Sequence, residues 1–585
     1  MNTSSTPPDW FSNIEQSLVV NGATDITWQH QTDLLVVGFG AAGASAALEG
    51  RESGLDVIVL DRFAGGGASV KSGGVVYAGG GTKVQESLGE QDTPQAMFDY
   101  LNLETQGVVK DETLMRFCEQ SSQNLDWLMS HGVKFSGPVF KKKTSYPNVK
   151  YFLYHSDNSL LPSHRGEYPP AARGHRGVIK NGNSAVNLGG AIFSPMRESA
   201  KKMGVQVDTQ TEARQLIVDK DGRVLGLKAL QLIPGSDAEK RHKRNSALAM
   251  AIATYFPNML PGGKFMRKLA QYFRNKVKHI EEEGREVVYY RARSGIVLSA
   301  GGFIFNRKMV KHYCPKYLKG LPLGTHADDG SGIRLGESVG GATKLMGNAT
   351  AWRFINPPLA WSQGIIVNQQ GARFVNESSY GATIGEAMVE RNNGKAWLIL
   401  DSRLVKQAWQ EIAPGKVLPF QQLLAALNHI VVKKKFKTTQ SMCSHYGFDL
   451  ATVEAEIARY SRVANGEIAD AFHKTKDDAV ALKAPYHVID ISLGQHLLPC
   501  TVLTMGGLDV NEESGQVVDA NKNAIPGLYA AGRTAVGIPS NLYMSGLSLA
   551  DCIFSGRRAA KHAAELSTQL SNAAVKHSSS SIDYC

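Results

Sequence analysis

The sequence has few of the features that mark disulfide-rich, metal-binding, exported or membrane-spanning proteins. Only six of its 585 residues are cysteine, and no two of them have CxxC spacing, so we expect neither a disulfide framework nor a metal site, and a reducing cytoplasm fits best. No apolar run reaches the roughly 18 residues that a membrane-spanning helix needs. The first 30 residues also lack the pattern of a signal peptide. The cysteines are Cys118, Cys314, Cys443, Cys500, Cys552 and Cys585.

Acidic residues are missing from one segment. Between Lys240 and Lys278 there are ten Lys or Arg and no Asp or Glu, whereas the rest of the chain has 54 basic and 53 acidic residues. The net charge of +11 therefore comes from this segment. Its location, more than its size, bears on function, because a local basic cluster attracts anionic partners.

Glycine is abundant, and its placement is informative. The chain has 59 glycines without a collagen-like period, and many cluster in short runs beside apolar strands. Such runs are typical of backbone that a ligand approaches closely. With 43% hydrophobic and 20% charged residues, the chain is long enough for two or three domains with sizeable cores.

The clearest motif lies near the N-terminus. Residues 33–43 are DLLVVGFGAAG, and a small-residue helix and a second strand, LDVIVLD, follow and end at Asp61. A strand, a Gly-x-Gly-x-x-Gly turn, a helix and a strand ending in an acid form the dinucleotide-binding fingerprint. Gly38 permits the tight turn, Gly40 admits the pyrophosphate and Gly43 lets helix and strand pack closely. Asp61 is placed for a ribose hydroxyl.

Two further segments favour FAD over a nicotinamide. Residues 65–85, GGGASVKSGGVVYAGGGTKVQ, are rich in glycine and hydroxyl groups, and residues 504–538 contain IPGLYAAGR. A site built from both ends of the chain suits a long FAD better than a nicotinamide held by one compact unit.

These segments, with SAGGF at residues 299–303, resemble the flavoprotein family that contains fumarate reductases and 3-ketosteroid dehydrogenases. The resemblance implies an FAD site with Arg533 and the Ser548–Leu549 backbone near the isoalloxazine and residues 300–302 near the pyrophosphate or adenosine. The cofactor-binding residues that it implies are Gly38, Gly40, Ala41, Ala42, Gly43, Asp61, Arg62, Ser69, Ser72, Gly73, Gly74, Ala300, Gly301, Gly302, Gly532, Arg533, Ser548 and Leu549.

The turn before the last helix bears on the substrate. Fumarate reductases have Arg-Leu-Gly-Gly-Asn-Ala-Leu there, with an arginine that grips a carboxylate, whereas this chain has Tyr543 in that register, within YMSGLSL. A phenol cannot neutralise a dicarboxylate but can donate one hydrogen bond to a ketone. We therefore expect a neutral substrate.

The Tyr-x-Ser-Gly turn and the GGGTKVQ run resemble the 3-oxo-5α-steroid 4-dehydrogenase branch. In that branch a second tyrosine follows a VNxxGxRFxNExxY pattern, and residues 366–380, IVNQQGARFVNESSY, place Tyr380 on it. The resemblance implies proton removal next to the C3 carbonyl and hydride transfer to flavin N5, with a double bond at C4–C5. Two alternatives are a 1-dehydrogenase, forming the C1–C2 bond, and a fumarate-reductase-like ene-reductase. A flavin-containing membrane protein without turnover is a third.

The resemblance also suggests residue roles. Tyr543, with N–H groups at the helix start, would hold the ketone oxygen, and Tyr380, relayed by Ser545, would take the proton. The two tyrosines could exchange these roles, and Ser545 could be a plain N-cap. Four further residues are expected to line the substrate pocket, namely Arg173, His175, Gly546 and Leu547. Arg173 and His175 could instead close a loop. His326 and Asp329 are expected to shape a turn beside the flavin.

The basic segment contains a pattern typical of an interfacial amphipathic helix. Its apolar face is predicted to hold Phe265, Met266, Leu269, Tyr272, Phe273, Val277 and Ile280, and its basic face Lys264, Arg267, Lys268, Arg274 and Lys278. We expect residues 240–280 to associate with the inner face of the cell membrane, while docking on the enzyme's own surface is the alternative. No nucleic-acid partner is expected.

The predicted architecture is an α/β, Rossmann-like FAD-binding domain with an inserted α+β catalytic domain and a helical basic insertion. No second dinucleotide fingerprint is visible, so we expect a quinone or another external acceptor to take the electrons. The predicted boundaries are 25–237, 291–324 and 491–570 for the FAD-binding domain, 238–290 for the insertion, 325–490 for the catalytic domain and 571–585 for a disordered tail.

Overall fold

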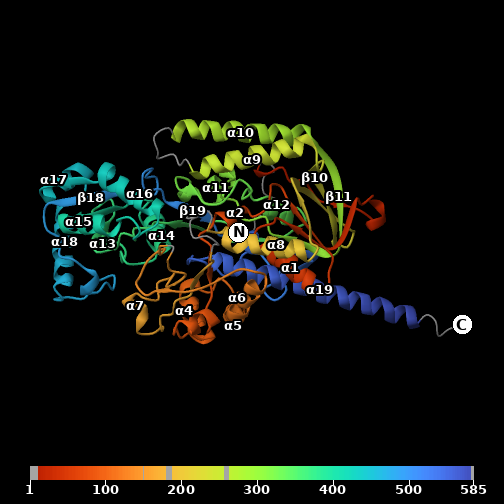
Figure 1. Ribbon diagram of the computed structural model, residues 1–585, viewed down its shortest axis with the longest axis horizontal. Coiled ribbons are helices and arrows are strands. Elements are labelled where there is room, and N and C mark those ends of the chain that lie inside the picture. Colours follow the sequence, from red (N-terminus) through yellow and green to blue (C-terminus); the bar gives the residue numbers. More distant parts are fainter. Residues whose placement is uncertain (1–10, 149, 179–187, 256–262, 581–585) are drawn as a thin grey trace.

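The computed structural model describes residues 11–148, 150–178, 188–255 and 263–580 (Figure 1). A nine-stranded mixed sheet carries the FAD-binding half of the chain. Its main path is β1-β9-β10-β11-β2-β3-β8, and β22 pairs with both β11 and β21. The strands are β1 (Leu18–Val19), β2 (His30–Val37), β3 (Val57–Asp61), β8 (Gln206–Thr209), β9 (Thr211–Val218), β10 (Val224–Leu232), β11 (Arg285–Leu298), β21 (Gln516–Val518) and β22 (Ala524–Ala530).

Strand β11 joins segments from both ends of the chain. Its C-terminal part runs parallel to β2 on one side and to β22 on the other, and its N-terminal part pairs antiparallel with β10. The apolar run of β2, with Leu34, Leu35 and Val36 fully buried, fits a central strand that is covered on both faces. The sheet therefore brings the early fingerprint and the late IPGLYAAGR segment side by side, as the sequence predicts.

Helices cover this sheet, and the long C-terminal helix α19 crosses α1 (Figure 1). A Cβ on Gly556 of α19 would overlap the carbonyl oxygen of Ala42 in α1, so the two backbones approach closely. The principal helices here are α1 (Ala41–Glu52), α2 (Gly67–Lys71), α8 (Gly190–Lys202), α12 (Ser331–Glu337) and α19 (Leu547–Ser580).

A helical segment and a small sheet of order β4-β7-β6-β5 follow the first Rossmann unit. The strands are β4 (Val75–Tyr77), β5 (Val139–Phe140), β6 (Leu153–Tyr154) and β7 (Gly174–Arg176). The helices are α3 (Lys83–Ser87), α4 (Pro94–Thr105), α5 (Asp111–Glu119), α6 (Ser121–Ser130) and α7 (Pro162–Arg165).

Most of the region predicted as the catalytic domain lies at the opposite end of the molecule from the C-terminal end of α19 (Figure 1). Its sheets are β15-β16-β18-β17, β12-β19-β14 and β13-β20. The strands are β12 (Leu321–Pro322), β13 (Thr343–Lys344), β14 (Ala349–Trp352), β15 (Ile365–Val367), β16 (Trp397–Asp401), β17 (Lys434–Phe436), β18 (Tyr486–Asp490), β19 (Thr501–Thr504) and β20 (Gly507–Leu508). The helices are α11 (Arg307–Tyr313), α13 (Leu359–Ser362), α14 (Gly381–Arg391), α15 (Ser402–Glu411), α16 (Pro419–Leu427), α17 (Thr439–Tyr446) and α18 (Leu450–Ala464). The β12-β19-β14 sheet extends beyond the predicted limits of 325 and 490 on both sides.

The basic insertion is a helical hairpin of α9 (Asp237–Tyr255) and α10 (Gly263–Glu283), which lies over the FAD-binding half (Figure 1). The predicted apolar face of α10 divides: Phe265 and Tyr272 are 68% and 51% exposed, whereas Val277 is buried. Of the predicted basic face, Arg267, Arg274 and Lys278 line a cavity beneath the hairpin, and the Lys264 side chain lies outside the described part.

Two expectations about the chain ends and membrane can be compared with the structure. Helix α19 runs to Ser580 and so includes residues 571–580 of the stretch expected to be a disordered tail; this stretch has neither Gly nor Pro to end a helix. Residues 581–585 lie outside the described range. In the described ranges, no helix combines the length and apolarity that crossing a bilayer requires.

Candidate active site

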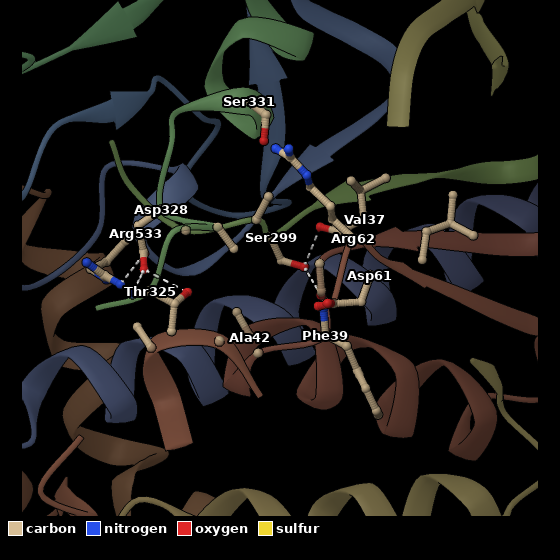
Figure 2. Close-up of a pocket in the computed structure, with 18 of the residues that line it drawn as sticks. Val37, Phe39, Ala42, Asp61, Arg62, Ser299, Thr325, Asp328, Ser331 and Arg533 are labelled. Carbon is tan, nitrogen blue, oxygen red and sulfur yellow. Dashed lines mark hydrogen bonds and ion pairs between the residues drawn. The ribbon is translucent and has the colours of Figure 1, made fainter. Parts of the chain in front are cut away.

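The cofactor cavity begins where β2 ends in the glycine turn (Figure 2). Gly38 has φ +101°, a value that residues with a side chain rarely adopt. A Cβ on Gly43 would overlap the Gly38 carbonyl oxygen, so helix α1 can begin this close to the turn only with glycine there. The result is a shallow cradle of backbone with room for a pyrophosphate at the start of α1.

Asp61 ends β3 and faces the same turn (Figure 2). One carboxylate oxygen accepts from Phe39 N at 3.0 Å, and the other accepts from the backbone N–H of Phe63 and Gly65 at 2.8 and 3.2 Å. Burial raises the pKa of Asp61, and these three donors oppose that effect. The oxygen that accepts only from Phe39 N retains a lone-pair direction for a ribose hydroxyl.

Arg62, the next residue, is held by carboxylates from three different elements. Its guanidinium lies 3.1 Å from Glu212 in β9, 2.8 Å from Glu281 in α10 and 3.2 Å from Asp329 before α12. Arg62 therefore ties the rim of the cofactor cavity to the helical hairpin.

The opposite wall comes from the middle and the end of the chain. Arg533 donates to Asp328 Oδ1 at 2.6 Å, whereas its Nη1 is buried and has no partner in the described part of the chain. Ser299 fixes the strand ends by donating to the carbonyls of Val37 and Gly38 (Figure 2). An unsatisfied guanidinium nitrogen in a cavity wall predicts an acceptor on the bound molecule.

This wall fits FAD: a glycine cradle for a pyrophosphate, a carboxylate for a ribose and a buried cation with a free donor. Ten of the predicted cofactor-binding residues line the cavity and eight do not. The ten are Gly38, Gly40, Ala41, Ala42, Asp61, Arg62, Ser69, Ala300, Gly301 and Arg533. The eight are Gly43, Ser72, Gly73, Gly74, Gly302, Gly532, Ser548 and Leu549.

Several lining residues escaped the sequence prediction, namely Ser299, Thr325, Asp328 and Ser331. The segment GTHADDGSG, from which a turn beside the flavin is predicted, does contain three of them. Their roles depend on tertiary contacts such as the Asp328–Arg533 pair, which no local pattern encodes.

The structure brings Tyr380 and Tyr543 into one buried cluster, here called the tyrosine pocket, with Leu503 and Met505. Tyr543 packs on Trp352 with ring centroids 4.6 Å apart, and Tyr380 packs on Phe354 at 5.8 Å. Both tyrosines are nearly inaccessible, at 6% and 1% exposure. Two phenols from distant segments therefore pack into one apolar cluster of side chains.

A short hydrogen-bonded chain leads away from Tyr380. Its hydroxyl is hydrogen-bonded to the Ser545 side chain, and Ser545 Oγ lies 2.9 Å from the Tyr154 hydroxyl. Tyr154 belongs to β6 and is fully buried. No local pattern predicts Tyr154, because β6 is only two residues long and has no motif around it.

The two predicted catalytic tyrosines differ in what they contact. Tyr543 accepts a hydrogen bond from the Gly546 backbone N–H, while Tyr380 contacts the Ser545 hydroxyl. Burial raises the pKa of Tyr543 above its ordinary value, and burial followed by the nearby Tyr543 and Tyr154 raises that of Tyr380 further, although the Ser545 hydrogen bond lowers it. Both phenols are therefore protonated at neutral pH.

Tyr380 is positioned by the start of α14, where it is the N-cap, and its backbone N–H donates to Asn158 Oδ1 at 2.6 Å. The preceding motif has a structural role: Arg373 pairs with Glu377 at 2.9 Å and with Asp470 at 2.7 Å, all three side chains being nearly fully buried. This network anchors the segment whose end places Tyr380 in the pocket.

The turn before α19 positions Tyr543 and Ser545. Gly546 has φ +89°, and a Cβ there would come within 2.7 Å of Tyr77 N, which donates to the Gly546 carbonyl. Ser156, after β6, accepts from Ser545 N at 3.3 Å and donates to its carbonyl at 3.1 Å. Leu547 is fully buried as the first residue of α19.

Arg173 and His175 lie in neither the cofactor cavity nor the cavity beneath the hairpin. Arg173 pairs with Asp92 at 2.7 Å, and His175 Nε2 lies 2.9 Å from the Thr82 hydroxyl, with both side chains fully buried. Burial lowers the pKa of His175 to about 4. These contacts fit the loop-closing alternative. Among the residues that the structure describes, no cluster of three or more His, Cys, Asp or Glu is arranged to hold a metal.

Comparison with known proteins agrees with this geometry. A family model described as "FAD binding domain" matches residues 33–549. The 3-oxo-5-alpha-steroid 4-dehydrogenase of Comamonas testosteroni is 38% identical over 525 residues, covering 89% of this chain and 96% of that protein. The 3-oxosteroid 1-dehydrogenase of Mycolicibacterium smegmatis is 25% identical over 589 residues, covering 87% and 93%.

One solved structure is similar over nearly the full length. The crystal structure of 3-ketosteroid-delta4-(5alpha)-dehydrogenase from Rhodococcus jostii RHA1, in complex with 4-androstene-3,17-dione, has a TM-score of 0.77 and 25% sequence identity. The alignment covers 94% of this chain and 100% of that chain.

Proposed function

Because the chain belongs to the FAD binding domain family, with a 4-dehydrogenase relative at 38% identity, we propose that it dehydrogenates 3-keto-5α-steroids between C4 and C5. FAD is the cofactor, and it accepts a hydride from the substrate when bound. The observation that carries the proposal is the pairing of Tyr380 and Tyr543 in one apolar pocket, with Ser545 hydrogen-bonded to the first.

Tyr543 is the residue that holds the ketone oxygen. The Gly546 N–H donates to its hydroxyl oxygen, which strengthens the phenol as a donor in turn. A backbone N–H cannot accept a proton, so Tyr543 has no route for a proton taken from carbon. It instead stabilises negative charge that develops on the ketone oxygen as the proton leaves C4.

Tyr380 is the residue that removes the C4 proton. Tyr380 acts in its tyrosinate form, which accepts the C4 proton and becomes the neutral phenol, and that proton then has to leave the pocket. Ser545, hydrogen-bonded to Tyr380 and 2.9 Å from Tyr154, offers that path. The geometry thus favours Tyr380 as the base over the exchanged assignment.

The test is anaerobic addition of 5α-androstane-3,17-dione to the holoenzyme. We expect the flavin absorbance to bleach and 4-androstene-3,17-dione to form. A Tyr543→Phe variant should keep its colour but bleach about 10²–10³-fold more slowly, the loss typical of an oxyanion donor. Tyr446→Phe, in α17, is the matched control and should not change the rate.

Other products would overturn the assignment in separate ways. A 1-ene product would identify a 1-dehydrogenase, and bleaching by succinate with none by steroid would identify an enzyme of the fumarate reductase type. If none of these compounds bleaches the flavin, the proposal that the protein is an enzyme is wrong.

The electrons are proposed to leave to an external acceptor, such as a quinone. The support is that the sequence contains one dinucleotide fingerprint, which the FAD-binding half uses. Steady turnover with a water-soluble quinone and none with NAD⁺ is the expected result, and turnover with NAD⁺ alone would contradict it.

Association with the inner face of the cell membrane is proposed through the outer face of the hairpin. Phe265 and Tyr272 are exposed there, and Lys276 lies 4.5 Å above the Tyr272 ring. Exposed aromatics beside lysines suit an anionic lipid surface. Co-sedimentation with anionic vesicles should fall in a Phe265→Ser/Tyr272→Ser variant at unchanged steroid turnover. Equal sedimentation of both proteins would contradict the proposal.

A further inference from the structure

A large open cavity lies beneath the α9–α10 hairpin, with a volume of about 1110 Å³. The hairpin forms one side, and residues 319–327 and 493–500 form another. Pockets for drug-sized ligands span roughly 300–1,000 Å³. The cavity therefore has room for a ligand segment in addition to the steroid nucleus held near the tyrosines.

Leu323 lies between this cavity and the tyrosine pocket. It lines the cavity and also packs against the cluster of Tyr380 and Tyr543. Asp61, Arg62 and Thr325 line both this cavity and the cofactor cavity. The cavity beneath the hairpin is therefore next to both sites, and the Leu323 side chain stands between it and the tyrosines.

The inner walls are apolar close to the helices. Ala249, Ile252 and Met250 of α9 and Ala270 and Val277 of α10 face it. Apolar walls of this kind suit an aliphatic chain, because each buried methylene contributes about 0.8 kcal/mol.

The same cavity is strongly cationic. Seven Lys or Arg side chains line it against two carboxylates, Asp61 and Glu281. Both acids already have partners: Asp61 accepts three backbone N–H groups, and Glu281 pairs with Arg62 and Arg285. Although burial opposes it, hydrogen bonds from His242 and Arg62 lower the pKa of Glu281 to about 2. Three of the cations also pair with carboxylates: Arg62 with Glu212, Glu281 and Asp329, Lys243 with Glu239, and Lys278 with Glu282.

Arg274 is the cation best placed to meet an anion. It projects from α10 into the cavity, and its Nε is buried with no partner in the described part of the chain. Ser246 Oγ of α9, another lining group, is likewise buried and unpartnered there. His326 and Arg62 line the same cavity, and burial, together with the positive charges of Arg274 and Arg62, lowers the pKa of His326 to about 4.

We propose that this cavity holds an aliphatic substrate side chain that ends in a carboxylate, with the carboxylate at Arg274. The substrate class is then 3-keto-5α-steroids with a carboxyl-terminated chain at C17, an inference that rests on the proposed dehydrogenation. The ketone remains the neutral end, at Tyr543, and the charge lies at the far end of the molecule. An Arg–carboxylate contact adds orientation as well as affinity.

The test compares three substrates of the holoenzyme: 3-oxo-5α-cholan-24-oic acid, its methyl ester and 5α-androstane-3,17-dione. We expect the acid to have the highest kcat/KM. Arg274→Gln should lower kcat/KM for the acid by about 10-fold or more, the effect of one charge-assisted hydrogen bond. The same variant should change the values for the ester and the dione by less than about twofold. Lys268→Gln, an exposed lysine on the same helix outside the cavity, is the matched control.

The outcomes separate this inference from the function on which it rests. If wild type converts none of the three steroids, the proposed function fails. If it converts the dione but has no preference for the acid over the ester, or if Arg274→Gln and Lys268→Gln behave alike, the dehydrogenation stands and the inference fails. If dodecanoate binds as tightly as the steroid acid with the same dependence on Arg274, the cavity is a general site for anionic lipids and the inference also fails.

Discussion

The cofactor cavity and the tyrosine pocket lie side by side but are built in different ways. The cofactor cavity presents backbone and very small side chains at its glycine turn, where Gly38, Gly40 and Ala41 line the wall. The tyrosine pocket is made of large side chains from separate elements, including Trp352, Tyr380 and Tyr543. We expect added side-chain atoms to impair the cofactor cavity and the removal of side-chain atoms to impair the tyrosine pocket.

This difference separates binding from chemistry. A backbone cradle recognises the part of a cofactor that many enzymes share, so its residues have little freedom to vary. A pocket of side chains can exchange one group for another, as the tyrosine in place of an arginine at position 543 illustrates. We therefore expect substitutions in the two regions to have separable effects on flavin content and on rate.

The largest effect is expected from Tyr380→Phe. The variant should retain FAD, because Tyr380 does not line the cofactor cavity, but should lose about 10²–10⁴-fold in flavin reduction by steroid, the range for a missing acid–base group. Stopped-flow reduction and the flavin-to-protein ratio measure the two quantities. If Tyr380→Phe loses both flavin and rate, the expected separation between cofactor binding and catalysis is wrong.

Gly43→Val should have the opposite signature. Its side chain would overlap the Gly38 carbonyl, so FAD occupancy should fall by about 10-fold to 100-fold, in line with the cost of overpacking. Gly22→Ala is the control, because a Cβ there meets nothing within 4 Å. Circular dichroism must show both variants folded. Full flavin content in Gly43→Val would contradict the assignment of the glycine turn as the pyrophosphate-binding site.

The pH dependence should report the tyrosine pocket alone. Burial raises the pKa of Tyr380 above its ordinary value near ~10, so the proton-accepting form is scarce at neutral pH. The value of kcat/KM should rise by up to about tenfold per pH unit from pH 7 to 9, while flavin content stays constant. A flat profile over this range would exclude Tyr380 as the base.

The smallest effect concerns the proton path. Ser545→Ala and Tyr154→Phe should each lower the rate, and the double variant should lose less than the product of the two losses. The expected coupling is about 1 kcal/mol, or roughly fivefold, because the hydroxyls are in direct contact at 2.9 Å. Independent, multiplicative losses would mean that Ser545 and Tyr154 do not act as one chain.

The sequence predicted the cofactor region better than the tyrosine pocket. The glycine spacing around Gly38 and Gly43 dictates a local turn, so it identifies the fold wherever a strand precedes it and a helix follows. The hydrophobic periodicity of α10 likewise predicted a helix in the insertion. Tyr380 and Tyr543 were found only through their resemblance to a family, since single tyrosines carry no local pattern.

The remaining features depend on contacts between distant segments. Tyr154 joins the pocket because β6 lies against the turn at Ser545, and Arg274 points inward because the hairpin folds back over the sheet. The periodicity of α10 separates an apolar from a basic side but does not state which side meets protein. The sequence therefore does not determine whether the basic side of α10 faces the solvent or the protein.

Arg62 links the hairpin to the rim of the cofactor cavity. Its guanidinium meets carboxylates of β9, α10 and the segment before α12 directly beside Asp61. A shift of α10 away from the sheet breaks the Arg62–Glu281 pair, the one of these three that involves the hairpin, and so changes the surroundings of Arg62 at the rim of the cofactor cavity. A ligand that moves α10 as it enters the cavity beneath the hairpin therefore also moves Arg62, which lines the cofactor cavity.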